Sequence, residues 1–460
     1  MPKYKYNPLV SLVMPEIREA ISKKDWHTLK EFISTWEPVD ITDLFKELNP
    51  EDMLIIFLLL PTSLQSAVFS KFDANTQEQI LKNLNDHQVK TILAETKPDD
   101  RTELFEELPP HLLRRLLNFL SLEDRKELLS LLAYPRGSVG RLLTPDYVAV
   151  KPSWTISNAL QHIRKIGKDV ETINVIYVVD DEGNLLDDIP IRKLILAEPN
   201  QTIESIMDKS FVSINAYADQ EEAVKVMQKY DLISLPVTNA QGELLGIVTI
   251  DDIIDILQEE QTEDFTKISA ITTKPTQLNF ITKIKEVPLS KLYRSRVTWL
   301  LALLLMDLIT GGIIQGFQET IARYVVLVTF LPVLVDTAGN AGAQSATLVI
   351  RAMALGTIQM RDWLILFGRE LFVAGALGVT MGLGISVMGI IRGRNLTIAS
   401  VVIIAMIVNV IVGSLIGILL PFIFTKFKRD PATASTPLIT TLADIIGTGI
   451  YLGIAFLMLR

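Results

Sequence analysis

Five apolar runs occupy the chain beyond residue 297, and they constrain its fold more than any other feature. An α-helix needs about 20 mostly apolar residues to cross a bilayer, and each run reaches that length. Residues 1–290 have the composition of soluble domains. We predict an all-α membrane domain over 297–460, with helices over the runs Trp299–Gln318, Tyr324–Ile350, Trp363–Ile391, Leu396–Phe424 and Pro437–Leu459.

Basic residues are divided unequally between the two ends of these runs. Loops rich in Lys and Arg stay on the cytoplasmic side of a membrane. The start of the chain lacks the apolar core of a secretory signal. We therefore predict a multi-pass protein of the cell (inner or plasma) membrane, with its N-terminus in the cytoplasm and its C-terminus outside. The cytoplasmic set is Lys291, Arg294, Arg296, Arg351, Arg361, Lys426, Lys428 and Arg429, against Arg323, Arg392, Arg394 and Arg460.

The second apolar run contains a polar interruption formed by Pro332, Gly339, Asn340 and Gly342. A helix in hydrocarbon must satisfy its own backbone groups, so these residues favour a break that lines a wet cavity. The alternative is a kinked helix whose small residues allow close packing against a neighbour. On the first interpretation, Gly339 and Asn340 line a pore.

A carboxylate lies about two turns into the last apolar run, at Asp444. Inserting it costs roughly 2.5–3.5 kcal/mol, so it should face the protein interior or water. Asp444 is therefore the leading candidate for a cation ligand, with Thr441 lining the same pore. The roles of Asp307 and Asp336 stay open, and attraction of cations to the pore mouth is one alternative for Asp336.

The composition excludes several classes of function. The formal net charge of −9 argues against a nucleic-acid partner and suits a cation. The chain has no Cys, so it has neither a disulfide framework nor a thiolate metal site. It also lacks a nucleophile–base grouping, zinc-type ligand spacing and a phosphate loop. We predict that the protein is not an enzyme.

A repeat of about 24 residues runs from about residue 40 to 132. In each copy, Pro or a small polar residue is followed by acids and then by an apolar run, near Pro50, Ala74, Pro98 and Leu122. This pattern is typical of helix starts. We predict an all-α superhelical N-terminal domain over residues 1–133, built from stacked short helices.

A longer repeat follows, and it resembles a tandem pair of α/β CBS domains over residues 134–262. Leu143–Val150 matches Met207–Ile214, and each is followed by a helical pattern and then by a hairpin with Gly in its turn. Modules of this kind often bind adenine nucleotides, so ATP is a candidate ligand.

The nucleotide motif of CBS domains is present in the second repeat alone. There it reads Gly246-Ile-Val-Thr249-Ile-Asp251-Asp252, which makes Thr249 and Asp252 the candidate nucleotide-binding residues. The alternative is that Thr249 is simply a half-buried strand residue. In the first repeat the glycine, hydroxyl and acid are replaced by Asp187, Pro190 and Lys193.

The segment that leaves the second module is strongly acidic, with seven acids and no base between Asp251 and Asp264. Such a face is either solvated or bound to divalent cations, which suit carboxylate oxygens. A connecting, or plug, helix over 263–296 then leads to the first membrane run. By their 3-4-4 spacing, four acids share one helical face: Asp252, Asp255, Glu259 and Glu263.

The order of these parts, with two membrane motifs, resembles the MgtE family of magnesium channels or transporters over almost the whole chain. The motifs are Gly339-Asn-x-Gly-x-Gln344 and Pro437-Leu-x-x-Thr-x-x-Asp444. The resemblance implies a homodimer in lipid whose pore lies on the two-fold axis, with Asp444 donated by each subunit. Mg²⁺ is then both the transported ion and a regulatory ligand.

The resemblance also implies a feedback mechanism. Plentiful cytosolic Mg²⁺ would bridge acids of the N domain, the CBS domains and the connecting helix, and would hold that helix across the pore. The acids that match the family's regulatory sites are Asp219, Glu221, Asp231, Asp252, Asp255, Glu260, Glu263, Asp264 and Asp430.

Two other functions stay open on the sequence. The first is a CBS-regulated carrier for another divalent cation such as Co²⁺, or for another solute. The second is a membrane-anchored sensor without transport, although this class gives Asp444 no purpose.

Overall fold

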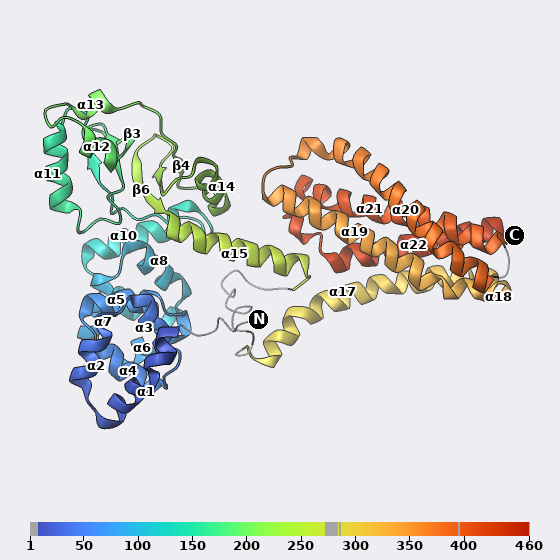
Figure 1. Ribbon diagram of the computed structural model, residues 1–460, viewed down its shortest axis with the longest axis horizontal. Coiled ribbons are helices and arrows are strands. Elements are labelled where there is room, and N and C mark those ends of the chain that lie inside the picture. The colour runs from blue at the N-terminus through green and yellow to red at the C-terminus, as the bar shows by residue number, and fades with distance from the viewer. Residues whose placement is uncertain (1–7, 272–283, 285–286, 394–395, 460) are drawn as a thin grey trace. The chain divides into compact units, whose positions relative to one another are not determined.

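The computed structural model describes residues 8–271, 284, 287–393 and 396–459 (Figure 1). The chain divides into two compact units, Met1–Leu257 and Gln258–Arg460, and each is described by itself. The first contains helical repeats and two α/β modules. The second contains long apolar helices.

From α2 onward, the helices of the N-terminal domain begin at regular intervals of twelve residues. The 24-residue repeat sets the starts of α4, α6, α8 and α10, and α5, α7 and α9 begin at the half-period. The predicted superhelical domain is thus confirmed, and its apolar residues share one core. The helices are α1 (Pro8–Lys23), α2 (Trp26–Ile33), α3 (Pro38–Phe45), α4 (Pro50–Leu59), α5 (Thr62–Ser70), α6 (Ala74–Asn83), α7 (Asp86–Glu95), α8 (Pro98–Glu107), α9 (Pro110–Leu117) and α10 (Leu122–Leu132).

Side-chain caps explain why the repeats start where they do. Asn49, Asp73 and Ser121 each accept a hydrogen bond from the backbone N–H three residues later, which satisfies a group that the helix leaves unpaired. Pro occupies the first turn of α4 and α8, where its missing N–H costs nothing. Acids in the first turns of α4, α8 and α10 also interact favourably with the positive end of the helix dipole.

Two three-stranded sheets confirm the tandem CBS prediction. In each sheet the first strand pairs parallel with the second, and the second pairs antiparallel with the third. Gly183 and Gly242 adopt φ of +89° and +93° in the matching hairpin turns, a conformation that favours glycine. The strands are β1 (Ala149–Val150), β2 (Val175–Val179), β3 (Leu185–Pro190), β4 (Ile214–Asn215), β5 (Ser234–Thr238) and β6 (Leu244–Thr249).

Helices complete the two modules and fasten them to the N-terminal domain. Lys97, the residue before α8, forms an ion pair of 2.7 Å with Glu171, and Glu106 at the other end of α8 pairs with Arg141. α8 is therefore joined to the CBS pair at two points. The module helices are η1 (Val139–Arg141), α11 (Ile156–Ile166), α12 (Ile191–Leu196), α13 (Ile203–Ile206) and α14 (Gln220–Tyr230).

A single helix, α15 (Ile250–Ile268), carries the acidic run out of the second module. Ile253 and Ile256 of this helix are buried in that module's core, and the acids lie on its other faces. The range predicted for the connecting helix, 263–296, extends beyond the end of α15. Residues 272–283 and 285–286 of that range lie outside the described residues.

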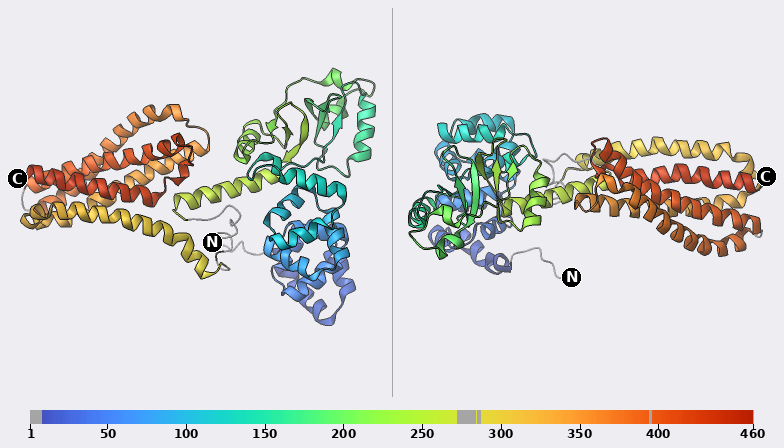
Figure 2. Two further views of the ribbon diagram at one scale, coloured as in Figure 1. Left: turned by 180° about the vertical axis from the view of Figure 1, so that it is seen from behind. Right: turned by 90° about the horizontal axis from the view of Figure 1, so that it is seen from above.

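Five helices of the second unit are long and apolar enough to cross a membrane, which agrees with the predicted number. They run side by side in both views of Figure 2. Among the described residues α21 is the most buried of the five, and α17 the least. The elements are α17 (Leu289–Gly316), α18 (Gln318–Arg323), η3 (Val325–Thr329), α19 (Leu331–Ala354), η4 (Met360–Asp362), α20 (Trp363–Gly393), α21 (Leu396–Lys426), η5 (Pro431–Thr433) and α22 (Thr436–Met458).

The predicted break at Gly339 and Asn340 is wrong, because α19 continues unbroken through both residues. Pro332 lies in the first turn of α19, where it removes no helical hydrogen bond. The glycines instead allow close packing. A Cβ on Gly417 of α21 would lie 2.0 Å from the carbonyl oxygen of Gly342, so the two backbones touch.

Enlarging Gly417 should therefore destabilise the membrane unit. We expect Gly417→Val to lower the free energy of unfolding by about 1–3 kcal/mol, because the added carbons overlap the α19 backbone. Thermal melting of the detergent-solubilised protein measures the effect. Gly384→Ala in α20 is the control, since nothing lies within 4 Å of its added Cβ. Equal melting temperatures for the two variants would contradict the packing.

Candidate functional site

Three membrane helices each contribute one carboxylate to a single cavity of about 430 Å³. Asp307 comes from α17, Asp336 from α19 and Asp444 from α22. Both Asp307 and Asp336 are close enough to Asp444 to repel it electrostatically. The cavity is lined by Asp307, Thr310, Gly311, Leu331, Pro332, Val335, Asp336, Asp444 and Thr448.

Asp444 is positioned by the packing of α22 against its neighbours. Asn409 of α21 is 1% exposed and donates a hydrogen bond of 3.2 Å to the carbonyl oxygen of Gly447. Thr440 packs against Gly339 of α19, where an added Cβ would lie 3.3 Å from it. Two helices therefore fix α22 on either side of Asp444, and the carboxylate is directed into the cavity that it lines.

The predicted pore-lining residues do not share this cavity with Asp444. Gly339 and Thr441 are buried, and neither is among the cavity's lining residues. Asn340 is exposed, and its side-chain amide donates a hydrogen bond of 3.1 Å to Asp336. Their part in a pore stays a prediction.

Asp307 lines the cavity, although its sequence context predicts no role for it. Its carboxylate has no neighbouring acid on its own helix, and its companions come from α19 and α22. The available signal was its position alone, since an acid within an apolar span must face water or protein. The sequence does not say that Asp307 and Asp444 face the same space.

A second acidic cluster lies in the first unit, between α8 and the start of α15. Burial and the nearby carboxylate of Asp99 raise the pKa of Asp252 to about 8. Burial and the carboxylate of Asp100 raise the pKa of Asp99 to about 7. One oxygen of Asp99 is buried without a hydrogen-bond partner. Lys97 offsets only part of the repulsion between these carboxylates, and a bound cation would offset more of it.

The cluster changes the interpretation of Thr249. The Thr249 hydroxyl lies within hydrogen-bonding distance of Asp251 and, at 2.9 Å, of Asp252. It can donate to one of them at a time. The two candidate nucleotide-binding residues therefore contact each other, and Asp252 also faces the acids of α8.

The other predicted regulatory acids have varied surroundings. Asp219 caps α14 by accepting from the N–H of Glu221, and Glu221 pairs with Lys225 at 3.0 Å. Asp231 ends the same helix in a left-handed conformation, with φ of 53°. Asp255 is exposed, and Glu260 and Asp264 are half-buried on α15. The role of these acids as cation ligands stays a prediction.

Glu263 and Asp430 are brought together by a base. Lys267 forms ion pairs with both, each at 2.5 Å, and so ties the end of α15 to the loop between α21 and α22 of the same unit. Burial disfavours the charged lysine, but the hydrogen bonds that it donates to Asp430 and Glu263 outweigh this effect, so the pKa of Lys267 is raised. A cation at this place would have to displace the lysine.

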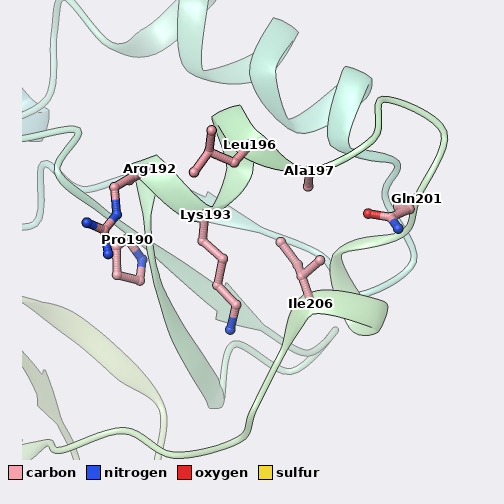
Figure 3. A pocket seen from close by; sticks show the side chains of 7 residues that line it. All are labelled: Pro190, Arg192, Lys193, Leu196, Ala197, Gln201 and Ile206. Atoms are coloured by element: carbon pink, nitrogen blue, oxygen red, sulfur yellow. The ribbon is translucent and has the colours of Figure 1, made fainter.

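The first CBS module contains a pocket of about 400 Å³ (Figure 3). Its charged lining residues are Arg192 and Lys193, and Lys193 lies 3.3 Å from Asp208. Lys193 occupies the place of the acid in the nucleotide motif. The pocket is lined by Pro190, Arg192, Lys193, Leu196, Ala197, Gln201 and Ile206.

Neither carboxylate cluster is arranged to chelate a bare ion. Among the described ranges, no group of three or more His, Cys, Asp or Glu residues has the geometry of a direct metal site. Mg²⁺ sheds its water reluctantly and commonly binds to proteins through a hydration shell. The membrane cavity, at about 430 Å³, has room for that shell.

Comparison with known proteins decides the family. The family profile described as "Divalent cation transporter" matches residues 331–454, that of the "MgtE intracellular N domain" matches 36–137, and the CBS profile matches 139–200 and 203–259. The magnesium transporter MgtE of Thermus thermophilus is 34% identical over 447 residues, which cover 96% of this chain and 98% of that protein. The chain belongs to the MgtE family.

Other members of the MgtE family agree. The magnesium transporter MgtE of Bacillus subtilis is 31% identical over 90% of this chain and 93% of its own length. A crystal structure of the cytosolic domain of the Mg²⁺ channel MgtE in complex with ATP matches with 34% identity and a TM-score of 0.51, over 52% of this chain and 98% of that one. The resemblance found in the sequence is confirmed, as is the predicted fold class.

The buried acids predict a dependence of stability on pH. The pKa values of Asp252 and Asp99, about 8 and 7, lie above their ordinary value of 3.8. The folded chain therefore holds protons that the unfolded chain releases, and stability falls as pH rises from about 4 to 8. Without Mg²⁺, we expect the melting temperature of the full chain to fall between pH 5 and 8.5, and Asp252→Asn to flatten this fall.

The matched control is Glu204→Gln, which removes an exposed acid of the first module. This variant should keep the slope of the parent. Adding Mg²⁺ should raise the melting temperature of the parent more at pH 8 than at pH 6, because the cation competes with protons for the same carboxylates. A parent and an Asp252→Asn variant with the same pH slope would contradict the cluster.

Proposed function

We propose that this protein is a Mg²⁺-selective channel for magnesium uptake, in which Asp444 of each subunit of a homodimer faces a pore on the two-fold axis. The single observation that carries the proposal is the position of Asp444 in an open cavity within the membrane helices. Membership of the MgtE family supports the ion, since relatives are named magnesium transporters. The basic residues of the loops support a cytoplasmic N-terminus in the cell membrane.

This arrangement of Asp444 residues suits the selection of an ion by its size and charge. Two carboxylates, one from each subunit, attract a divalent ion without replacing its inner waters. Backbone carbonyls near Gly339 and Thr441 are the proposed contacts for those waters. No catalytic step is required, and we assign the protein no enzyme activity.

Cytosolic Mg²⁺ is the proposed regulator. Support comes from Asp252, which faces Asp99 where the second CBS module meets the N-terminal domain. An ion bound there removes the repulsion and joins the two domains, and loss of the ion separates them. The further proposed ligands are Asp219, Glu221, Asp231, Asp255, Glu260, Glu263, Asp264 and Asp430.

ATP is a proposed second ligand of the CBS pair. The relative crystallised with ATP supports binding by this chain. At the second module, Thr249 and Asp252 are the proposed contacts, and a nucleotide there would have to break the hydrogen bond between them. At the first module, Arg192 and Lys193 suit phosphate groups, which favours the pocket of Figure 3 as the alternative position.

A second candidate function is a carrier for another divalent cation such as Co²⁺. The family profile that matches the membrane helices is described as "Divalent cation transporter", without naming one ion. This description favours transport of divalent cations other than Mg²⁺ as well. Uptake measured with Mg²⁺ and Co²⁺ in competition separates the two candidates.

Removing the Asp444 carboxylate tests the transport proposal. In cells that lack their own Mg²⁺ uptake systems, the parent should restore growth at low Mg²⁺ and carry a Mg²⁺ current, and Asp444→Ala should do neither. Glu319→Ala, an exposed acid of α18, is the control and should behave as the parent. Equal rescue by Asp444→Ala would remove this residue from the mechanism.

Regulation is tested by a triple variant, Asp252→Asn with Glu260→Gln and Glu263→Gln. Currents through the parent should close at millimolar internal Mg²⁺, whereas the triple variant should stay open because its domains are no longer bridged. Inside-out patches measure this directly, with Glu204→Gln as the neutral control. Closure of the triple variant at the parent's Mg²⁺ concentration would overturn the feedback model.

A further inference from the structure

The cavity around Asp444 carries more negative charge than one pore carboxylate requires. Asp307 and Asp336 line it as well, and its lining residues include no base. Within the described ranges, none of the three forms an ion pair. The Asn340 amide bonded to Asp336 is neutral and cannot offset the charge. Three carboxylates therefore face one space without a counter-charge from the chain.

Two hydroxyl groups of the same cavity are also unsatisfied. The Thr310 Oγ is buried and has no hydrogen-bond partner. Thr448 is 1% exposed, and its hydroxyl has no partner among the described residues. Thr310 lies three residues after Asp307, and Thr448 lies four after Asp444, so each shares the face of its carboxylate. A buried hydroxyl without a partner costs free energy unless a ligand or water satisfies it.

The oxygen groups match a hydrated divalent cation. Carboxylate and hydroxyl oxygens suit a hard ion such as Mg²⁺, and its waters can donate to all of them. Six first-shell waters occupy about 180 Å³ at about 30 Å³ each. The cavity of about 430 Å³ holds such an ion beside Asp444 with space to spare.

We propose that Asp307 and Asp336, with the hydroxyls of Thr310 and Thr448, form a second binding position for a hydrated divalent cation, next to Asp444 and within one protomer. The inference rests on the proposed function and extends it. All four side chains belong to one chain, so this position does not need the partner subunit. Asp307 makes α17 a part of the ion path.

Two adjacent positions serve conduction. One tight site holds its ion too long, whereas an arriving ion at a neighbouring site repels the first and speeds its release. The outer carboxylates also concentrate cations at the entrance, so they should act mainly when external Mg²⁺ is scarce.

Direct ion binding provides the test. Mn²⁺ binding to the purified full-length protein in detergent is counted by electron paramagnetic resonance, which detects free Mn²⁺. We expect the double variant Asp307→Asn with Asp336→Asn to bind one Mn²⁺ fewer per chain than the parent, or to bind it at least tenfold more weakly. Glu319→Gln should bind as the parent does, and the cytosolic sites contribute equally to all three proteins.

Transport separates this proposal from the proposed function. The double variant should still take up Mg²⁺, but half-maximal uptake should need about five- to tenfold more external Mg²⁺, while Asp444→Ala abolishes uptake. Unchanged Mn²⁺ binding and an unchanged concentration dependence would overturn the second position and leave the channel proposal intact. If Asp444→Ala and the double variant both restore growth as well as the parent does, the channel proposal itself is overturned.

A near-isosteric variant guards against misfolding of the double variant. Thr448→Val removes the hydroxyl and keeps the shape, so the packing of α22 should survive. We expect Thr448→Val to raise the Mg²⁺ concentration for half-maximal uptake about threefold, with an unchanged maximum rate and melting temperature. Identical concentration curves for Thr448→Val and the parent, together with unchanged Mn²⁺ binding, would count against the proposal.

Discussion

An ionised carboxylate inside a bilayer needs water or a cation beside it, and this requirement organises the membrane unit. Asp444 lies on a helix that Asn409 and Gly339 fix from two sides, so the carboxylate cannot turn away from its cavity. The same requirement applies to Asp307 and Asp336. The apolar faces of the helices supply the fold, and the few acids determine which faces must meet around water.

The first unit, Met1–Leu257, also contains buried carboxylates that repel one another. Asp99 and Asp252 belong to different domains, and both are buried enough for their pKa values to rise toward neutrality. Such a pair destabilises the contact between the domains until a proton or a cation neutralises it. The strength of this contact therefore depends on whether these two carboxylates are charged.

Local patterns in the sequence predicted most of the fold. The 24-residue repeat located the helix starts at Pro50, Ala74, Pro98 and Leu122, because caps and prolines act within one turn. The polar run in α19 led to the wrong prediction of a break. Glycine permits both a break and close packing, and the backbone of α21 at Gly413 and Gly417, which faces α19, decides for close packing. Asp307 was missed for the same reason: its companions lie on other helices, and sequence spacing does not reveal them.

The contact between α19 and α21 limits how this membrane unit can move. With the carbonyl of Gly342 against Gly417 and that of Ala338 against Gly413, the two helices cannot slide past each other without collision. They form one rigid body. α17, whose apolar stretch is only 6% buried within the chain, packs least against the rest of the unit. A displacement of α17 against this rigid pair would carry Asp307 with it and change the shape of the cavity around Asp444.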